Sequence, residues 1–266
     1  MAGHTSLSGL GRSVEPKLRS HRTAFAGTLT SGALYAGIAA IDDRPISDAL
    51  IAGLAVFIAW AIGRELDPDR PNTGAWAMPF AFAALVYDMP SALAAAIALM
   101  GLRVVAGTIG ARVTWLDVGV LALLGFGSGS EQVLWIVGLV FGMWLLSAPE
   151  VGSLRYVALA ALVLGLFAGV WLAEPASVEI TQDAYLLAAL GGVVMMLAMR
   201  PSVVISKTDA RTGPIDASRI GLARKAAGSF LMWAALMGGV AGFWMISPVL
   251  AALTATAIAK WFSPGA

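Results

Sequence analysis

Apolar runs of membrane-spanning length alternate with short charged segments along most of the chain, and this pattern limits the fold more than any other feature. A transmembrane helix needs about 20 apolar residues, or somewhat fewer where the bilayer thins. Hydrophobic residues make up 59% of the 266 and charged residues only 12%, whereas a soluble domain carries about 25% charge. The sequence therefore predicts an all-α fold, a polytopic transmembrane helical bundle of about 8–10 membrane segments.

Ten apolar runs bounded by charged residues or proline are candidate membrane segments. They lie at 23–41, 46–63, 74–89, 91–110, 117–129, 131–148, 156–173, 184–199, 228–246 and 248–262. The runs 117–129 and 248–262 are short, so each is expected to be a re-entrant half-helix or part of a longer, broken element. We predict one transmembrane domain, 23–262, between a basic cytoplasmic tail, 1–22, and a C-terminal tail, 263–266.

Positive residues sort to one side of the membrane when the N-terminus is placed inside and the chain crosses ten times. Of the 17 Lys and Arg residues, only Arg44 then lies outside. Such a split is expected because Lys and Arg hold short loops in the cytoplasm. The predicted cytoplasmic loops lie near 64–73, 111–116, 149–155 and 200–227, and the outer loops are acidic. We therefore predict a multi-pass protein of the plasma (inner) membrane with a cytoplasmic N-terminus.

The densest cluster of charge is the segment 64–72, which follows the second apolar run. It carries Arg64, Glu65, Asp67, Asp69 and Arg70. Because Asp67 and Asp69 flank a proline in an extended turn, they could share a divalent cation at the cytoplasmic rim, beside arginines suited to a phosphate. The favoured interpretation is simpler: the carboxylates pair with Arg64, Arg70 or Arg112 and fix neighbouring loops.

Arg103 is the most informative single residue of the apolar runs. It precedes Arg112 by nine residues, which is about 13 Å along a continuous helix. If Arg112 marks the interface, Arg103 lies in the hydrocarbon, where a charge faces a partner or a wet cavity. The expected partner is Asp117, Asp67 or Asp69. Alternatively, Arg103 reaches back to the interface, or the segment 103–116 lies along the membrane surface.

The glycine-rich stretch 125–132 interrupts an apolar region. The favoured interpretation is a tight outer turn in which Ser130 caps the next helix and Glu131 stands in its first turn. The alternative is a broken helix that lines a binding site. On that alternative, Glu131 joins Arg103 and Asp117 as a candidate substrate-binding or pore residue.

The loop 200–227 is the longest predicted cytoplasmic connection and is basic. Asp216 is expected to cap a helix within it, with the basic residues spread around the rim. Anionic lipid is the expected partner of such a helix. With a net charge of +1, the chain shows no bulk excess of charge toward nucleic acid, so no nucleic-acid partner is predicted.

Cofactor chemistry is limited by composition. The chain has no cysteine, and its two histidines, His4 and His21, lie in the predicted tail. No haem or metal ligated by His or Cys is therefore expected, and any other cofactor is left unknown.

Three functions are compatible with the sequence. Permease- or channel-like transport of a small solute or lipid is favoured by the number of segments and by Arg103. A non-catalytic accessory subunit, within a homo-oligomer or a membrane complex, is favoured by the scarcity of polar residues in the runs. An intramembrane enzyme for a lipid-linked phosphate would depend on Asp67 and Asp69.

Overall fold

The computed structural model describes residues 17–109, 114–130, 181–199, 204–208 and 213–262, with isolated positions at 163, 167, 168 and 171. The described part of the chain is all-α, and its only extended pairing is an isolated antiparallel bridge between Lys207 and Pro214. The helices are α1 (Arg19–Ile41), α2 (Ser47–Leu66), α3 (Pro71–Ala84), α4 (Ala92–Ala106), α5 (Trp115–Ser130), α8 (Gln182–Ala198), α9 (Ala217–Met245) and α10 (Ser247–Phe262).

Helix length and composition fit a membrane protein. Among the described residues, α1, α2 and α9 are long and apolar enough to cross a membrane, and α4, α5, α8 and α10 are shorter apolar helices. The outer surface agrees, since large apolar side chains such as Leu29, Leu50 and Leu123 are 72%, 79% and 72% exposed. Large apolar side chains exposed on α1, α2 and α5 fit a surface that faces lipid rather than water. The number of crossings and their orientation stay predictions.

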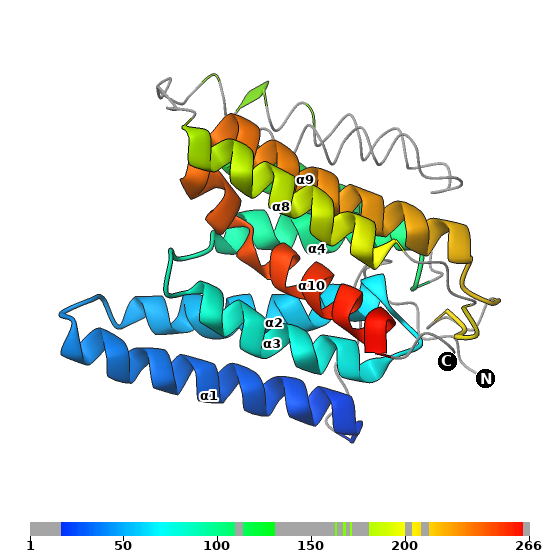
Figure 1. The fold of residues 1–266 in the computed structure, drawn as a ribbon, viewed down its shortest axis with the longest axis horizontal. Coiled ribbons are helices and arrows are strands. Elements are labelled where there is room, and N and C mark those ends of the chain that lie inside the picture. Colours follow the sequence, from blue (N-terminus) through cyan, green and yellow to red (C-terminus); the bar gives the residue numbers. More distant parts are fainter. Residues whose placement is uncertain are drawn as a thin grey trace.

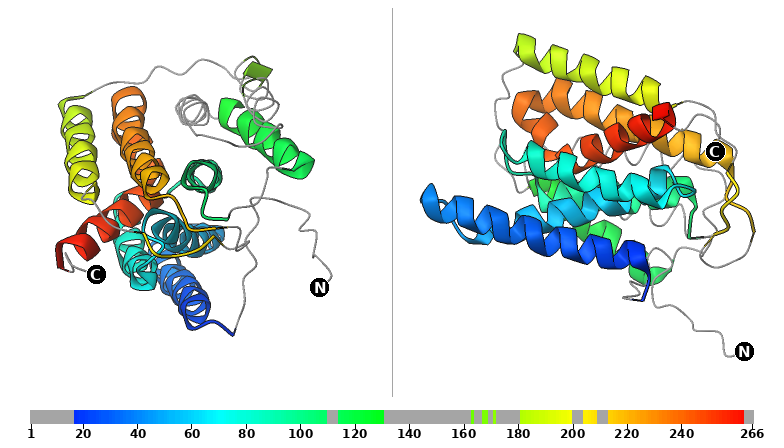
Figure 2. Two further views of the ribbon diagram at one scale, coloured as in Figure 1. Left: turned by 90° about the vertical axis from the view of Figure 1, so that its right-hand side faces the viewer. Right: turned by 60° about the horizontal axis from the view of Figure 1, so that its bottom comes forward.

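The second helix forms the centre of the described bundle. α2 packs against α1, α3, α4 and α10, as Figure 1 shows. Its contact with α3 is close because glycines face each other: a Cβ on Gly63 would lie 3.0 Å from Gly74 Cα. Small residues let helix backbones approach in this way. α1 lies at the edge of the bundle in both views of Figure 2.

Basic and acidic residues lie at opposite ends of the described helical bundle. In Figure 1 the C-terminal ends of α2 and α10 lie on the right with the N-terminal ends of α1 and α9. Basic residues of the described helices and of the turn before α3 stand at this end, which we call the network end: Arg19, Arg22, Arg64, Arg70, Arg103, Arg219, Arg224, Lys225 and Lys260. At the opposite end stand Asp42, Asp43, Asp48, Asp88 and Asp183, with Arg44. The structure thus brings together the residues that the topology prediction placed on one side.

Several helix bounds differ from the predicted runs. α3 ends at Ala84 rather than near 89, and α4 ends at Ala106 because Gly107, with φ of 65°, terminates it in the left-handed region. α1 begins at Arg19, so His21 lies in a helix and not in the predicted tail.

Two larger corrections concern the glycine-rich stretch from residue 125 and the basic loop 200–227. α5 continues through Ser130, so the tight turn expected from residue 125 onward is wrong for the described part of that stretch. The runs 131–148 and 156–173, with Glu131, lie outside the described residues apart from the isolated positions. α9 runs from Ala217 to Met245 with a break at Gly239 (φ 65°, ψ −157°), so the second half of the predicted loop 200–227 belongs to this long helix.

Candidate functional site

A buried ion pair joins the last turns of α2 and α4. Arg103 Nε donates to Glu65 Oε1 at 3.1 Å. The Glu65 side chain is fully buried and that of Arg103 is 13% exposed. Thr108, just beyond α4, donates its hydroxyl to the other carboxylate oxygen. Two helix ends are therefore held together by a charge that water does not reach.

The partner of Arg103 differs from the one expected. The prediction named Asp117, Asp67 or Asp69, and the structure supplies Glu65 instead. Arg103 also lies in the last turn of α4, so no continuous helix connects it to residue 112. Asp117 is buried at the start of α5, where its carboxylate accepts bonds from the backbone and hydroxyl of Thr114.

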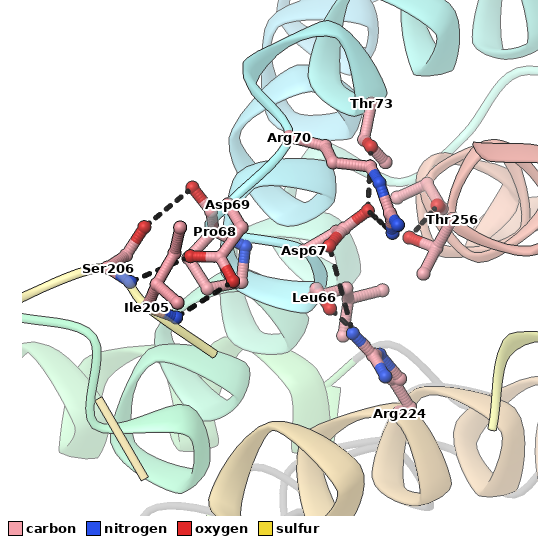
Figure 3. A network of polar contacts seen from close by, with 11 residues as sticks. Leu66, Asp67, Pro68, Asp69, Arg70, Thr73, Ile205, Ser206, Arg224 and Thr256 are labelled. Carbon is pink, nitrogen blue, oxygen red and sulfur yellow. Dashed lines mark hydrogen bonds and ion pairs between the residues drawn. The ribbon is translucent and has the colours of Figure 1, made fainter. Parts of the chain in front are cut away.

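A second network surrounds Asp67, the residue that follows α2. Its Oδ2 accepts from the Thr73 hydroxyl at 3.0 Å and lies 3.5 Å from Arg70 Nη1, and its Oδ1 lies 3.9 Å from Arg224 Nη2. Arg224 Nε donates to the Leu66 carbonyl at 2.9 Å. One carboxylate thus connects α3 and α9 at the end of α2 (Figure 3).

Asp69 faces a different part of the chain. Its two carboxylate oxygens accept from the backbone N–H groups of Ile205 and Ser206, at 3.1 and 2.8 Å. The Ser206 hydroxyl donates to the Pro68 carbonyl at 3.4 Å. Asp69 therefore fastens the segment before α9 to the turn between α2 and α3.

The two aspartates do not converge on a shared point. Figure 3 shows Asp67 directed toward the arginines and Asp69 toward residues 205 and 206. The hypothesis of one cation shared by Asp67 and Asp69 is therefore corrected. The alternative, in which the carboxylates pair with nearby arginines and fix loops, is confirmed for Asp67 and Arg70.

Arg64 lies beside the N-terminal turn of α1. Its Nη1 is 2.8 Å from His21 Nε2, and because a guanidinium only donates, the imidazole accepts at this nitrogen. The guanidinium also stands 5.4 Å from the Trp60 ring centroid, and the His21 ring meets the same Trp60 edge-on. These contacts fix α1 to α2 at the network end.

Arg219 and Asp216 define the start of α9. Arg219 Nε and Nη2 donate to the carbonyls of Val105 and Val104, at 3.1 and 2.8 Å, where α4 ends. The Asp216 carboxylate accepts from Ser218 N at 2.8 Å, which confirms the expected cap. Hydrogen bonds from Ser218 lower the pKa of Asp216 below its ordinary value, and the bond from the Ser218 side chain has a larger effect than the bond from its backbone.

The sequence interpretation missed several buried polar residues. Arg224 was expected on the basic rim of a surface helix, but it is 3% exposed because it faces Asp67 at the end of α2. Lys260 on α10 is equally buried, and Thr73 and Thr108 are fully buried. The available signal was spacing: Arg224 lies five residues after Arg219, in the part of α9 that leads without a break into its apolar run.

An apolar groove occupies the end of the bundle opposite the network. Its volume is about 170 Å³, and Tyr87, Trp244 and Ser247 are among the lining residues. The Tyr87 and Trp244 rings stack with centroids 4.4 Å apart. Paired aromatics of this kind are typical of the level where a bilayer meets water.

Comparison with protein families, with curated proteins and with solved structures finds no match to this chain. The function therefore has to follow from the side chains themselves. Ion pairs between helix ends can hold a path closed, and buried cations can bind an anion.

Proposed function

We propose that the protein is a permease-like membrane protein that moves a small solute or a lipid, and that the network end closes its path. The observation that supports this proposal most directly is the pair between Glu65 and Arg103, which locks α2 to α4. Charged side chains inside a helical membrane protein are costly and usually belong to a transport path or its barrier. The second pair, between Asp67 and Arg224, fixes α9 to the same end.

A closed state of this kind opens when its ion pairs exchange partners. Packed helices switch between discrete arrangements, and interfacial salt bridges are what such a switch rearranges. The glycine break in α9 at Gly239 provides a point at which the long part of α9 next to the network end would move relative to the short part that follows. Transport would therefore require Glu65 and Arg103 to separate.

Flux measurements in proteoliposomes test the proposal. Glu65→Gln removes the charge that holds Arg103, and Asp183→Asn, at an exposed position of the opposite end, is the matched control. Potassium- and chloride-sensitive dyes and a fluorescent phospholipid serve as probes. We expect Glu65→Gln to change flux of at least one probe roughly tenfold, which corresponds to about 1.4 kcal/mol in the barrier. If neither wild-type protein nor Glu65→Gln moves any probe above empty vesicles, transport of these probe classes is rejected.

An assembly subunit is the second candidate, and α1 is the observation that favours it. Only 22% of the apolar stretch of α1 is buried, against 72% for α2. Its exposed side chains include Leu29, Leu34 and Ile41. The exposed surface of α1 would take a partner helix, or a second copy of the chain, as readily as lipid. Co-purification of a partner in fixed ratio from mild detergent, lost in Leu29→Gln with Leu34→Gln, would support this function over transport.

An enzyme acting on a lipid-linked phosphate is the third candidate. This hypothesis needs a cation shared by Asp67 and Asp69, and the two side chains make different contacts in the described geometry. The basic side chains near Arg70 are the only part of the hypothesis that this geometry still favours.

A further inference from the structure

Arg224 carries a buried hydrogen-bond donor that the described residues leave unsatisfied. Its side chain is 4% exposed, and Nε is occupied by the Leu66 carbonyl. Nη2 has no hydrogen-bond acceptor, and the nearest carboxylate oxygen, Asp67 Oδ1, is 3.9 Å away. That distance is too long for a hydrogen bond. A buried charged donor without an acceptor is costly, so this position favours an additional anionic oxygen.

Two more cations lie within electrostatic range of this donor. Arg70 lies in the turn just before α3, and Lys260, which is 3% exposed, comes from the last turn of α10. The charges of Arg224 and Arg70 both repel the Lys260 ammonium, and Asp67 and Asp69 attract it. Positive charges from α9, from α10 and from the turn before α3 therefore act on one another in the same region.

The nearby carboxylates already have other contacts. Asp67 divides its oxygens between Thr73 and the two arginines, and Asp69 accepts two backbone N–H groups of the 205–206 segment (Figure 3). Neither oxygen of Asp67 approaches Arg224 Nη2 within hydrogen-bond distance. An external anion is the group that would complete the coordination of this donor.

The cluster lies close to the surface of the network end. Lys260 is followed by Trp261 and Phe262, which are 55% and 79% exposed. Arg70 and Asp67 stand in the turn between α2 and α3 rather than within a helix. Aromatic residues at a helix end are typical of the membrane interface, which is the depth of lipid phosphates.

We propose that Arg224, Lys260 and Arg70 form a binding site for a phosphate group, supplied by a lipid headgroup or by free phosphate. Phosphate suits the site because it presents several charged oxygens, which a guanidinium binds in its fork and an ammonium binds as a point charge. Asp67 holds the arginines in position without filling the site. The proposal goes beyond transport, since binding is measurable without flux.

Binding to the purified full-length protein in mild detergent tests the site. Inorganic phosphate is titrated against the thermal unfolding midpoint, with chloride at equal ionic strength as reference. In parallel, phosphatidic acid is compared with diacylglycerol, which has the same chains and no phosphate, by native mass spectrometry. The variants are Arg224→Gln and Lys260→Gln. Lys225→Gln is the matched control, because it changes the next, exposed residue of the same helix.

We expect wild-type protein and Lys225→Gln to bind at least one phosphate probe, and Arg224→Gln and Lys260→Gln to bind it roughly tenfold more weakly or not at all. Binding of inorganic phosphate identifies the free anion as a sufficient source, and binding of phosphatidic acid alone identifies a lipid. If Arg224→Gln does not fold, Lys260→Gln decides the result. Absence of binding in the wild type, or wild-type affinity in a folded Lys260→Gln, overturns the proposal, whatever the outcome of the flux measurements.

Discussion

Glu65 and Arg103 lie 38 residues apart in the sequence, and their side chains meet at 3.1 Å between the ends of α2 and α4. Each charge needs the other, because removing one partner of a buried pair leaves an uncompensated charge that costs about 3–5 kcal/mol. The pair therefore explains why two helix ends with buried polar groups stay together.

Glu65→Gln is expected to lower the free energy of unfolding by about 3 kcal/mol, since Arg103 then lacks its counter-charge and Thr108 loses a charged acceptor. Equilibrium unfolding in mixed micelles with increasing dodecyl sulfate measures this change. Asp183→Asn, an exposed change at the opposite end, is expected to stay within about 0.5 kcal/mol of wild type. Equal stability of Glu65→Gln and Asp183→Asn would show that the pair does not stabilise the fold.

Arg219→Ala is expected to release the C-terminal end of α4. The Val104 and Val105 carbonyls lose a charged donor, and hydrogen bonds of this type contribute about 1.5–3 kcal/mol each. Hydrogen exchange should accelerate in the last turn of α4 more than elsewhere. Lys225→Ala, on the exposed face of the same helix, should leave that exchange unchanged. Acceleration spread evenly over all helices would contradict a local cap.

Asp69→Asn is expected to loosen the segment before α9 without unfolding the bundle. The Ile205 and Ser206 amides would lose a carboxylate acceptor and keep only a weaker, neutral one. Their exchange rates should rise, while the unfolding midpoint falls only slightly. Protection at both amides equal to that of wild type would show that other contacts hold the segment.

The cap of α9 should make a pH-dependent contribution to stability. Asp216→Ala is expected to lower stability by about 1 kcal/mol near neutral pH, because Ser218 N loses its acceptor. The folded state lowers the pKa of Asp216, so the stabilisation is present above the ordinary aspartate pKa of about 3.9 and is lost as pH falls through the lower folded value.

Unfolding midpoints of wild type and Asp216→Ala, measured from pH 7 downward, check this sign. The two curves should be separated at neutral pH and should converge at the acidic end. A separation that grows as pH falls is the opposite sign and would contradict the cap assignment.

Sequence reasoning predicted the features that depend on composition and local spacing. The helical class, most helix positions, the cap by Asp216 and the pairing of Asp67 with Arg70 follow from apolar runs, short-range geometry and charge. These properties need only residues that are close in the chain. The separation of basic from acidic residues between the two ends follows from assigning successive loops to alternate sides of the membrane.

The features that were not predicted depend on how the helices are rotated relative to one another and on where they end. The choice of Glu65 as the partner of Arg103 required the relative rotation of α2 and α4, which the sequence does not encode locally. Arg224 was placed on the rim of a surface helix because of its charge, whereas Asp67 and the Leu66 carbonyl allow it to be buried. The described part of the glycine-rich stretch, 125–130, is helical despite its glycines, since backbone groups in an apolar environment must bond within the helix.

The side of the membrane that each end of the bundle faces tests the proposed topology most directly. The chain has no cysteine, so Lys207→Cys near the network end and Asp43→Cys at the opposite end can each be labelled without background; both positions are exposed. With a membrane-impermeant maleimide, we predict labelling of Asp43→Cys in intact cells and of Lys207→Cys only after permeabilisation. Labelling of Lys207→Cys in intact cells, or of both positions alike, would contradict a bundle whose basic end faces the cytoplasm.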